Sequence, residues 1–150
     1  MARYVVQVFE GLAKELKGEI DEPSVRVIFV LSPLPKTFVG KNGNNILGLD
    51  RMAANSIVLQ PEAILPSQEY QPFVQQKLKE ATDAIEAYAE RTEQNTEFRY
   101  INYANPEQNP LASYGVENGK FLVKTVEKYD PSRYFQSSVI GAFKLSDLAW

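Results

Sequence analysis

The sequence contains no cysteine and no histidine among its 150 residues. Without cysteine the chain can form no disulfide, thiolate nucleophile or cysteine zinc site, and without histidine it lacks the commonest general base and transition-metal ligand. We therefore expect no metal site. The chain also has no apolar run near the ~20 residues that a membrane helix needs, and its N-terminus has no signal-peptide pattern. These absences predict a cytoplasmic protein with no membrane partner.

Positive charge is scarce as well. The 16 lysines and arginines face 19 aspartates and glutamates, so the formal net charge is -3. Binding to a phosphate backbone requires a basic surface, so we expect no nucleic-acid partner. A hydrophobic content of 44% and a charged content of 23% are typical of globular proteins, and a chain of this length can bury one core. We expect a single domain, residues 1–150.

Apolar residues recur at helical spacing in three segments. The first covers residues 4–16, with Gly18 at the place of a C-cap glycine. The second covers residues 67–91 and has Pro72 in its first turn. The third covers residues 116–129 and should end at Asp130-Pro131, with these side chains inward: Phe121, Leu122, Val123, Val126 and Tyr129.

The remaining apolar segments predict strands. Residues 24–32 are typical of a central strand ended by Pro33, residues 55–60 of a strand closed by Pro61, and residues 96–104 of a third strand. An Asn42-Gly43 pair predicts a hairpin turn. The order favours an α+β fold, an antiparallel sheet with helices packed on one face and the other face exposed for a ligand or another chain.

The C-terminal segment, residues 132–150, is irregular but apolar. We expect it to pack back on the body of the protein, with Tyr134 and Phe135 as anchors.

Four sequence motifs carry a family resemblance. They are "GNNILGLD", "FRYINYANPEQNPLASYGVEN", "KYDPSRYFQ" and "GAFKL", in this order over roughly residues 42–145. They resemble the C-terminal part of the substrate-binding domain of fungal berberine-bridge-enzyme-like FAD-linked oxidoreductases. The resemblance implies an antiparallel sheet flanked by helices. The flavin-binding domain of that family, with its glycine-rich phosphate loops, has no counterpart in this sequence, so we expect no cofactor.

The resemblance also points to residues. The second tyrosine of the family's Y-x-N-Y motif often acts as a base over the flavin, and it falls on Tyr103, while Tyr100 and Asn102 match the other motif positions. On a strand, Tyr100 and Asn102 would point to one face and Tyr103 to the other, so the motif can line one surface only if the strand ends or bulges near Asn102. Asn105 stands where the family has aspartate and Ala142 where it has glycine. The first change removes a charge and weakens any acid–base role there.

Tyr103 is better suited to donate a hydrogen bond than to act as a base, because a phenol has a pKa near ~10. Arg99 could hold a carboxylate or polarise a carbonyl, so we assign catalysis to Tyr103 and Arg99. We assign substrate binding to Tyr100, Asn102, Asp50 and Arg51. The structural alternatives are a packed Tyr103, an Arg99 paired with a glutamate such as Glu93 or Glu97, and an Asp50 that caps its own turn.

These observations predict a cofactor-independent enzyme of fungal natural-product biosynthesis. It would cyclise a small organic substrate, in a Diels-Alder-type reaction for example, or isomerise it, because orientation alone can supply about 7 to 11 kcal/mol of a barrier. The alternatives are a non-catalytic substrate-binding subunit and a degenerate or split FAD-linked oxidoreductase. We also expect a homo-oligomer, because loss of the flavin domain should leave apolar surface that needs cover.

Overall fold

A computed structural model describes residues 1–21, 24–38, 45–141 and 143–148. The chain forms two compact units, one of residues 1–32 and 58–95 and the other of residues 33–57 and 96–150. Each has its own apolar cluster. The expectation of one cooperative domain stays a prediction. None of the described helices combines the length and apolar character needed to cross a membrane.

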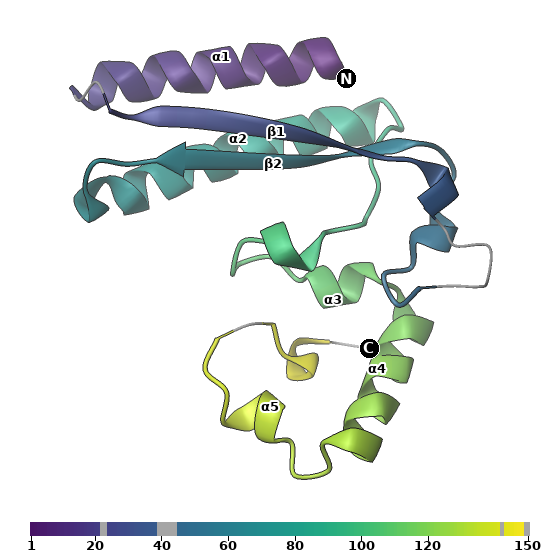
Figure 1. Ribbon diagram of the computed structural model, residues 1–150. Helices are drawn as coiled ribbons and strands as arrows, with labels where there is room; N and C mark the ends of the chain where they lie inside the picture. The colour runs from purple at the N-terminus through teal and green to yellow at the C-terminus, as the bar shows by residue number, and fades with distance from the viewer. Residues whose placement is uncertain (22–23, 39–44, 142, 149–150) are drawn as a thin grey trace. The chain divides into compact units, whose positions relative to one another are not determined.

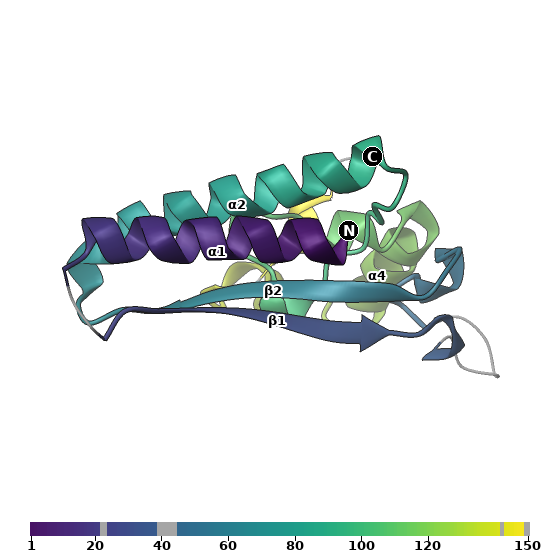
Figure 2. The same cartoon turned by 90° about the horizontal axis from the view of Figure 1, so that it is seen from above.

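The first unit consists of two long helices over a two-stranded ribbon. Helix α1 spans Ala2–Glu19 and α2 spans Gln71–Arg91, while β1 spans Arg26–Leu34 and β2 spans Ser56–Ile64. The strands run in opposite directions (Figure 1), and both helices lie on the same side of the ribbon (Figure 2). The predicted α+β class and the placement of helices on one face are therefore confirmed for this unit.

The core of this unit follows the helical periodicity of the sequence. Its buried members are aliphatic: Leu12, Leu16, Ile20, Val25, Val74 and Ala81. Burial of a leucine, isoleucine or valine side chain contributes about 1.5 to 3 kcal/mol. Two further contacts join the helices, a stacked Tyr4–Tyr88 pair with ring centroids 4.2 Å apart and an ion pair of 2.7 Å between Glu15 and Lys77. The hydrogen bond to Glu15 is the main cause of a raised pKa of Lys77.

Three details of the first unit differ from the sequence prediction. Helix α1 continues through Gly18 to Glu19, and the N–H of Ile20 closes it on the carbonyl of Leu16. Strand β1 includes Pro33 and strand β2 includes Pro61. Both strands are edge strands, where a missing N–H is tolerated, so these prolines do not end them. For the same reason β1 is not a central strand.

The second unit is built from short elements. The described ones are η1 (Lys36–Phe38), η2 (Leu49–Arg51), η4 (Ile101–Tyr103), α3 (Pro110–Ser113), α4 (Val116–Tyr129), α5 (Tyr134–Ser137) and η5 (Leu145–Asp147). Helix α4 has the predicted bounds, but its side chains do not all point inward. Phe121 is 62% exposed and Tyr129 is 74% exposed, so the prediction for these two was wrong.

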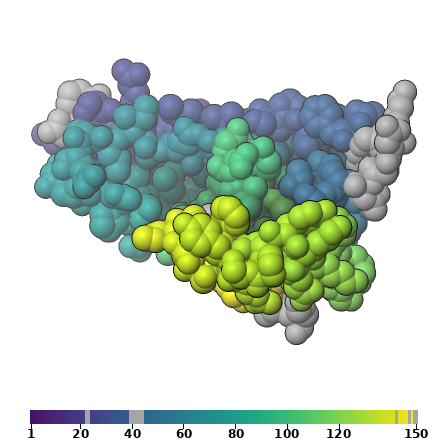
Figure 3. Space-filling model, turned by 60° about the horizontal axis from the view of Figure 1, so that its bottom comes forward, coloured from purple at the N-terminus to yellow at the C-terminus, as the bar shows by residue number. Residues whose placement is uncertain are grey.

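The C-terminal segment packs on the second unit as expected, but through other residues. Leu148 is buried with Leu111 and Tyr114, whereas Tyr134 and Phe135 are exposed and do not act as anchors. The Asp130 carboxylate accepts hydrogen bonds from the N–H groups of Tyr134 and Phe135, at 2.8 and 3.0 Å. Figure 3 shows the surface that α4 and this segment form together. The prediction that "KYDPSRYFQ" is a packing motif was therefore wrong: its large side chains are exposed, and Asp130 caps the turn that it forms.

The strand predicted for residues 96–104 is absent. The chain is irregular to Tyr100 and then forms η4. A strand needs a partner to pair with, and here other groups take the backbone bonds. The Arg99 N–H donates to Ser113 Oγ at 3.0 Å, and the Arg99 guanidinium donates to the carbonyl of Thr96 at 3.1 Å. The hairpin turn predicted at Asn42-Gly43 and the position of Ala142 lie outside the described residues.

Candidate functional site

The motif Tyr100–Tyr103 folds into a compact polar and aromatic cluster. Residues three apart in a 3₁₀ turn lie on the same side, and η4 places Tyr100 and Tyr103 in this relation. Their rings meet edge to face, with centroids 5.0 Å apart and planes at 85°. Asn102 Nδ2 donates to the Tyr100 hydroxyl at 2.9 Å. In the sequence prediction the motif could share one surface only if the strand ended or bulged near Asn102, and the 3₁₀ turn in place of a strand brings all three motif residues together.

The cluster reaches the surface of the second unit. Tyr103 is 51% exposed and Asn102 is exposed, while Tyr100 is half-buried. Because Tyr100 accepts the bond from Asn102, its own hydroxyl proton is free to be donated outward. A hydroxyl that accepts one hydrogen bond becomes a stronger donor of another. The cluster therefore contains two phenol hydroxyls that can donate hydrogen bonds, on rings that pack edge to face.

An aromatic series connects this surface to the core of the unit. Phe98 stacks with Tyr100 at 6.5 Å and with Tyr114 at 6.1 Å. Tyr114 is 3% exposed, and its hydroxyl makes no hydrogen bond of normal geometry with the described residues. Burial raises the pKa of the Tyr114 phenol above its usual value, and the backbone of Ile101 offsets part of that rise. The base of the cluster is therefore a buried tyrosine ring whose hydroxyl is shielded from solvent.

Arg99 contributes to the shape of the cluster through backbone groups. Its guanidinium donates to the carbonyls of Thr96, Glu97 and Phe98, at 3.1, 3.5 and 3.3 Å. These bonds fold the segment just before Tyr100 around the arginine side chain. The geometry favours a positioning role for Arg99, and its assignment to catalysis stays a prediction.

Arg51 joins two of the sequence motifs. Its Nη2 donates to the carbonyl of Ser113 at 2.5 Å, which connects the "GLDR" loop to the "SYG" turn. The glycines on either side leave room for it. A Cβ on Gly115 would lie 2.9 Å from Arg51 Cζ, and a Cβ on Gly48 would lie 2.5 Å from the Tyr114 carbonyl oxygen. Both glycines have positive φ, 92° and 68°. Arg51 is therefore a structural connection, while Asp50 beside it is exposed.

Ser113 is the residue that sequence reasoning missed. It is 8% exposed, and its Oγ donates to the carbonyl of Pro110 at 2.6 Å while accepting the N–H of Arg99. The Ser113 carbonyl accepts a hydrogen bond from Arg51, so this one buried serine contacts both arginines of the predicted site, Arg51 and Arg99. The only signal in the sequence was a small polar residue next to the apolar Leu111 and Tyr114. Such a residue in a buried turn usually has several hydrogen-bond partners.

Asn105 stabilises a turn through hydrogen bonds to the backbone and to the Gln108 side chain. Its side-chain oxygen accepts the N–H of Glu107 at 2.9 Å, and its own N–H donates to Gln108 Oε1 at 3.0 Å. This is an Asx turn, which aspartate and asparagine form equally well. Asn109 has a similar role at the start of α3, where it accepts the N–H of Ala112 at 3.1 Å. The change from aspartate to asparagine is therefore compatible with the fold.

The Gly115 turn, before α4, does not fit the diphosphate of a flavin dinucleotide. A dinucleotide diphosphate needs an open glycine turn at a helix N-terminus. The Gly115 turn before α4 is filled by the Arg51 side chain, and Tyr114 closes on Gly48. Within the described part of the chain no three acidic side chains come together as a metal site.

Comparison with known proteins identifies fungal relatives. The chain is 34% identical over 142 residues to the FAD-dependent monooxygenase drtC of Aspergillus calidoustus, a match of 93% of this chain and 27% of that protein. It is 29% identical over 148 residues to the FAD-dependent monooxygenase FUP4 of Fusarium proliferatum, covering 97% of this chain and 28% of that one. It is 38% identical over 66 residues to the bifunctional solanapyrone synthase of Alternaria solani, covering 44% of this chain and 13% of the synthase.

The chain matches only part of these relatives. The chain spans about a quarter of the length of the two monooxygenases that it matches over most of its own length. No protein-family profile matches it, and no solved structure matches it. The similarity to fungal FAD-dependent monooxygenases is therefore established by sequence.

Proposed function

We propose that this chain acts in fungal natural-product biosynthesis by holding a small organic substrate against the tyrosine cluster of Tyr100, Asn102 and Tyr103. The observation that carries the proposal is the edge-to-face pair of Tyr100 and Tyr103, in which Asn102 donates to the Tyr100 hydroxyl and Phe98 stacks with the Tyr100 ring. The relatives support the setting, since they are fungal monooxygenases and a solanapyrone synthase. The likeness to the substrate-binding domain of berberine-bridge-like oxidoreductases is part of the same proposal.

The chemistry that we propose is an intramolecular cyclisation or isomerisation without a cofactor. A hydrogen bond from Tyr103 to a substrate carbonyl withdraws electron density from a conjugated polyene and stabilises the charge that develops at the oxygen in the transition state. Tyr100 gives a second donor from the same side. Neither role needs the phenol to ionise, and neither needs a histidine or a cysteine.

The test uses substrates whose product has the same mass. The purified chain is incubated with linear polyene ketones, for example pseudoionone, and isomers of unchanged mass and altered retention are quantified by liquid chromatography and mass spectrometry. Tyr103→Phe should lower the rate of isomer formation at least about tenfold, because it removes one donor and keeps the ring. Tyr129→Phe, on the same unit and 74% exposed, is the matched control and should leave the rate unchanged. No isomer above the protein-free background would contradict the cofactor-free proposal.

A second candidate is a substrate-binding subunit that serves a separate flavoprotein. Two observations favour it: the relatives are FAD-dependent, and Tyr103 is half exposed instead of enclosed. In that case the chain alone would bind the ketone without converting it. Conversion would appear only when a flavin-loaded partner is added, and Tyr103→Phe would then weaken binding.

We also propose that the chain self-associates. The second unit exposes a set of large apolar side chains on α4 and the C-terminal segment: Val116, Phe121, Tyr129, Tyr134, Phe135 and Ile140. Isolated soluble domains rarely leave such surface uncovered. Light scattering should give a mass above 16.9 kDa at micromolar concentration, and the monomer mass would contradict this.

A further inference from the structure

Strand β1 has an edge that no other strand of the described residues covers. The sheet has two strands, so β1 pairs with β2 along one side only. On the other side, every second residue presents an N–H and a C=O that the described backbone does not bind. Such an edge is a template for pairing with another extended chain.

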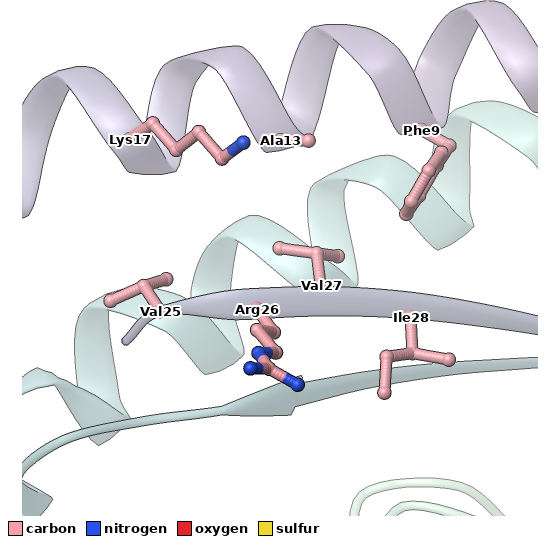
Figure 4. A pocket seen from close by; sticks show the side chains of 7 residues that line it. All are labelled: Phe9, Ala13, Lys17, Val25, Arg26, Val27 and Ile28. Atoms are coloured by element: carbon pink, nitrogen blue, oxygen red, sulfur yellow. The ribbon is translucent and has the colours of Figure 1, made fainter. Parts of the chain in front are cut away.

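A groove of about 460 Å³ runs beside this edge. It is lined by Phe9, Ala13 and Lys17 of α1 and by residues 25–28 at the start of β1 (Figure 4). Successive side chains of a strand point to opposite faces, so a groove that touches four consecutive residues must follow the edge of the strand. In Figure 4, Val25 and Val27 point toward α1, and Arg26 and Ile28 point to the opposite face.

The groove carries one cation on each side of the edge. Lys17 lies on the α1 side and Arg26 on the opposite side (Figure 4). Among the residues that the structure describes, no carboxylate bonds either side chain. The chain as a whole carries a net charge of -3, so two cations and no acid in this lining stand out from the composition. The apolar floor between them comes from Phe9, Ala13 and Val27.

We propose that the free edge of β1 binds an extended acidic segment of another polypeptide as a third strand. The N–H and C=O groups of the edge would pair with the backbone of the incoming segment. Two neighbouring acidic residues on that segment would point to opposite faces, one toward Lys17 and the other toward Arg26. Its next apolar side chain on the α1 side would pack on Phe9 and Ala13.

The arrangement of charges favours this occupant over two others. A small amphiphile has one anionic head, which can meet only one of two cations that lie on opposite faces of a strand. A second copy that paired through its own β1 would offer no carboxylate to Arg26 or Lys17, because β1 contains no acidic residue. An acidic peptide satisfies both cations and the backbone groups together.

The test is peptide binding measured by fluorescence anisotropy on the full chain. The probe is a fluorescein-labelled octapeptide that alternates threonine and valine around a central Glu-Glu pair. One comparison peptide has Lys-Lys at the centre, and two more carry N-methyl groups on one or the other set of alternate residues. We expect saturable binding of the Glu-Glu peptide, about tenfold weaker binding of the Lys-Lys peptide, and a similar loss for one of the two N-methylated peptides.

Variants locate the site. Arg26→Glu and Lys17→Glu should each weaken binding of the Glu-Glu peptide about tenfold. Lys14→Glu is the matched control, because Lys14 is an exposed residue of α1 that does not line the groove. Equal binding of the Glu-Glu and Lys-Lys peptides, full binding of both N-methylated peptides, or an equal loss in Lys14→Glu would overturn the proposal. Sedimentation velocity showing a dimer that Arg26→Glu abolishes would also overturn it, since a second copy would then occupy the edge. The peptide comparisons decide the question on the unmodified protein if a variant fails to fold.

Discussion

Each of the two units of this chain is stabilised internally, and the kind of interaction differs between them. In the first, helices of 18 and 21 residues cover two nine-residue strands, and the buried side chains are almost all aliphatic. In the second, short helices and 3₁₀ turns are joined by side chains that bond backbone groups, among them Arg51, Asn105, Asn109, Ser113 and Asp130. The comparison teaches that apolar side chains buried at regular spacing are enough to form helices packed on strands. Short turns that place hydrogen-bond donors on a surface need specific side-chain hydrogen bonds as well.

The largest effect should come from the aliphatic core of the first unit. Leu16 of α1 is fully buried in the core of this unit. Leu16→Ala should therefore lower the free energy of unfolding by about 3 kcal/mol, because apolar burial is lost and a cavity is left. Val6→Ala on the same helix, where the side chain is 47% exposed, is the control and should change little. Urea denaturation followed by circular dichroism measures both. A single transition would support one cooperative domain, and two transitions would show that the units unfold separately.

The next effect should come from a glycine of the second unit. Gly115 has φ 92° and ψ 156°, a conformation open almost only to glycine, and a Cβ would meet the Arg51 guanidinium. Gly115→Ala should lower the stability by about 2 kcal/mol. Gly18→Ala, in helix α1 with no atom near the added Cβ, should raise it by about 0.5 kcal/mol. Replacement of glycine by alanine should thus lower the stability in the second unit and raise it in the first.

A double variant sharpens this comparison. If contact with Arg51 contributes to the loss, the Gly115→Ala, Arg51→Ala pair should be less destabilised than the sum of the single variants, by about 0.5 kcal/mol or more. Strict additivity would leave backbone conformation as the whole cause.

A smaller effect should come from the cap that Asp130 forms on the C-terminal segment. Asp130→Ala removes the acceptor of the Tyr134 and Phe135 N–H groups and should cost about 1 kcal/mol. Asp130→Asn keeps an acceptor and should lose less. Amide hydrogen exchange at Tyr134 and Phe135 reports the change locally, and unchanged protection in Asp130→Ala would refute the capping role.

The smallest effect at neutral pH, with a distinctive pH dependence, should come from Tyr114. Its pKa is raised in the folded state because burial disfavours the phenolate, so the protein loses stability as the pH rises from the ordinary tyrosine pKa of about 10 toward the folded value. Tyr114→Phe should stabilise the protein by up to about 1 kcal/mol at pH 7, because it removes a buried hydroxyl without a partner. It should also flatten the loss of stability above pH 10, and a destabilised variant would contradict this account.

The sequence predicted the periodic parts of the fold and missed the contacts between distant segments. The stripe of α2 and the bounds of α4 follow from local spacing, and the structure confirms them. The strand predicted at residues 96–104 fails because alternation alone cannot supply a pairing partner, and Arg99 and Ser113 take the backbone instead. The meeting of Arg51 with Ser113, 62 positions apart, has no local signal at all. The assignment of Tyr100, Asn102 and Tyr103 came from a family motif and stays a prediction, and the 3₁₀ turn that brings them together was not predicted.

The most direct test of the central claim compares two tyrosine pairs in one experiment. The protein is labelled with ¹³C in its tyrosine rings, assigned by single Tyr→Phe variants, and titrated with pseudoionone while the ring signals are followed by NMR. If the cluster of the second unit contacts substrate, the signals of Tyr100 and Tyr103 should shift and saturate, while those of the stacked Tyr4–Tyr88 pair of the first unit stay in place. Shifts confined to Tyr4 and Tyr88, or no saturable shift at Tyr100 and Tyr103, would contradict the claim that this cluster is the substrate surface.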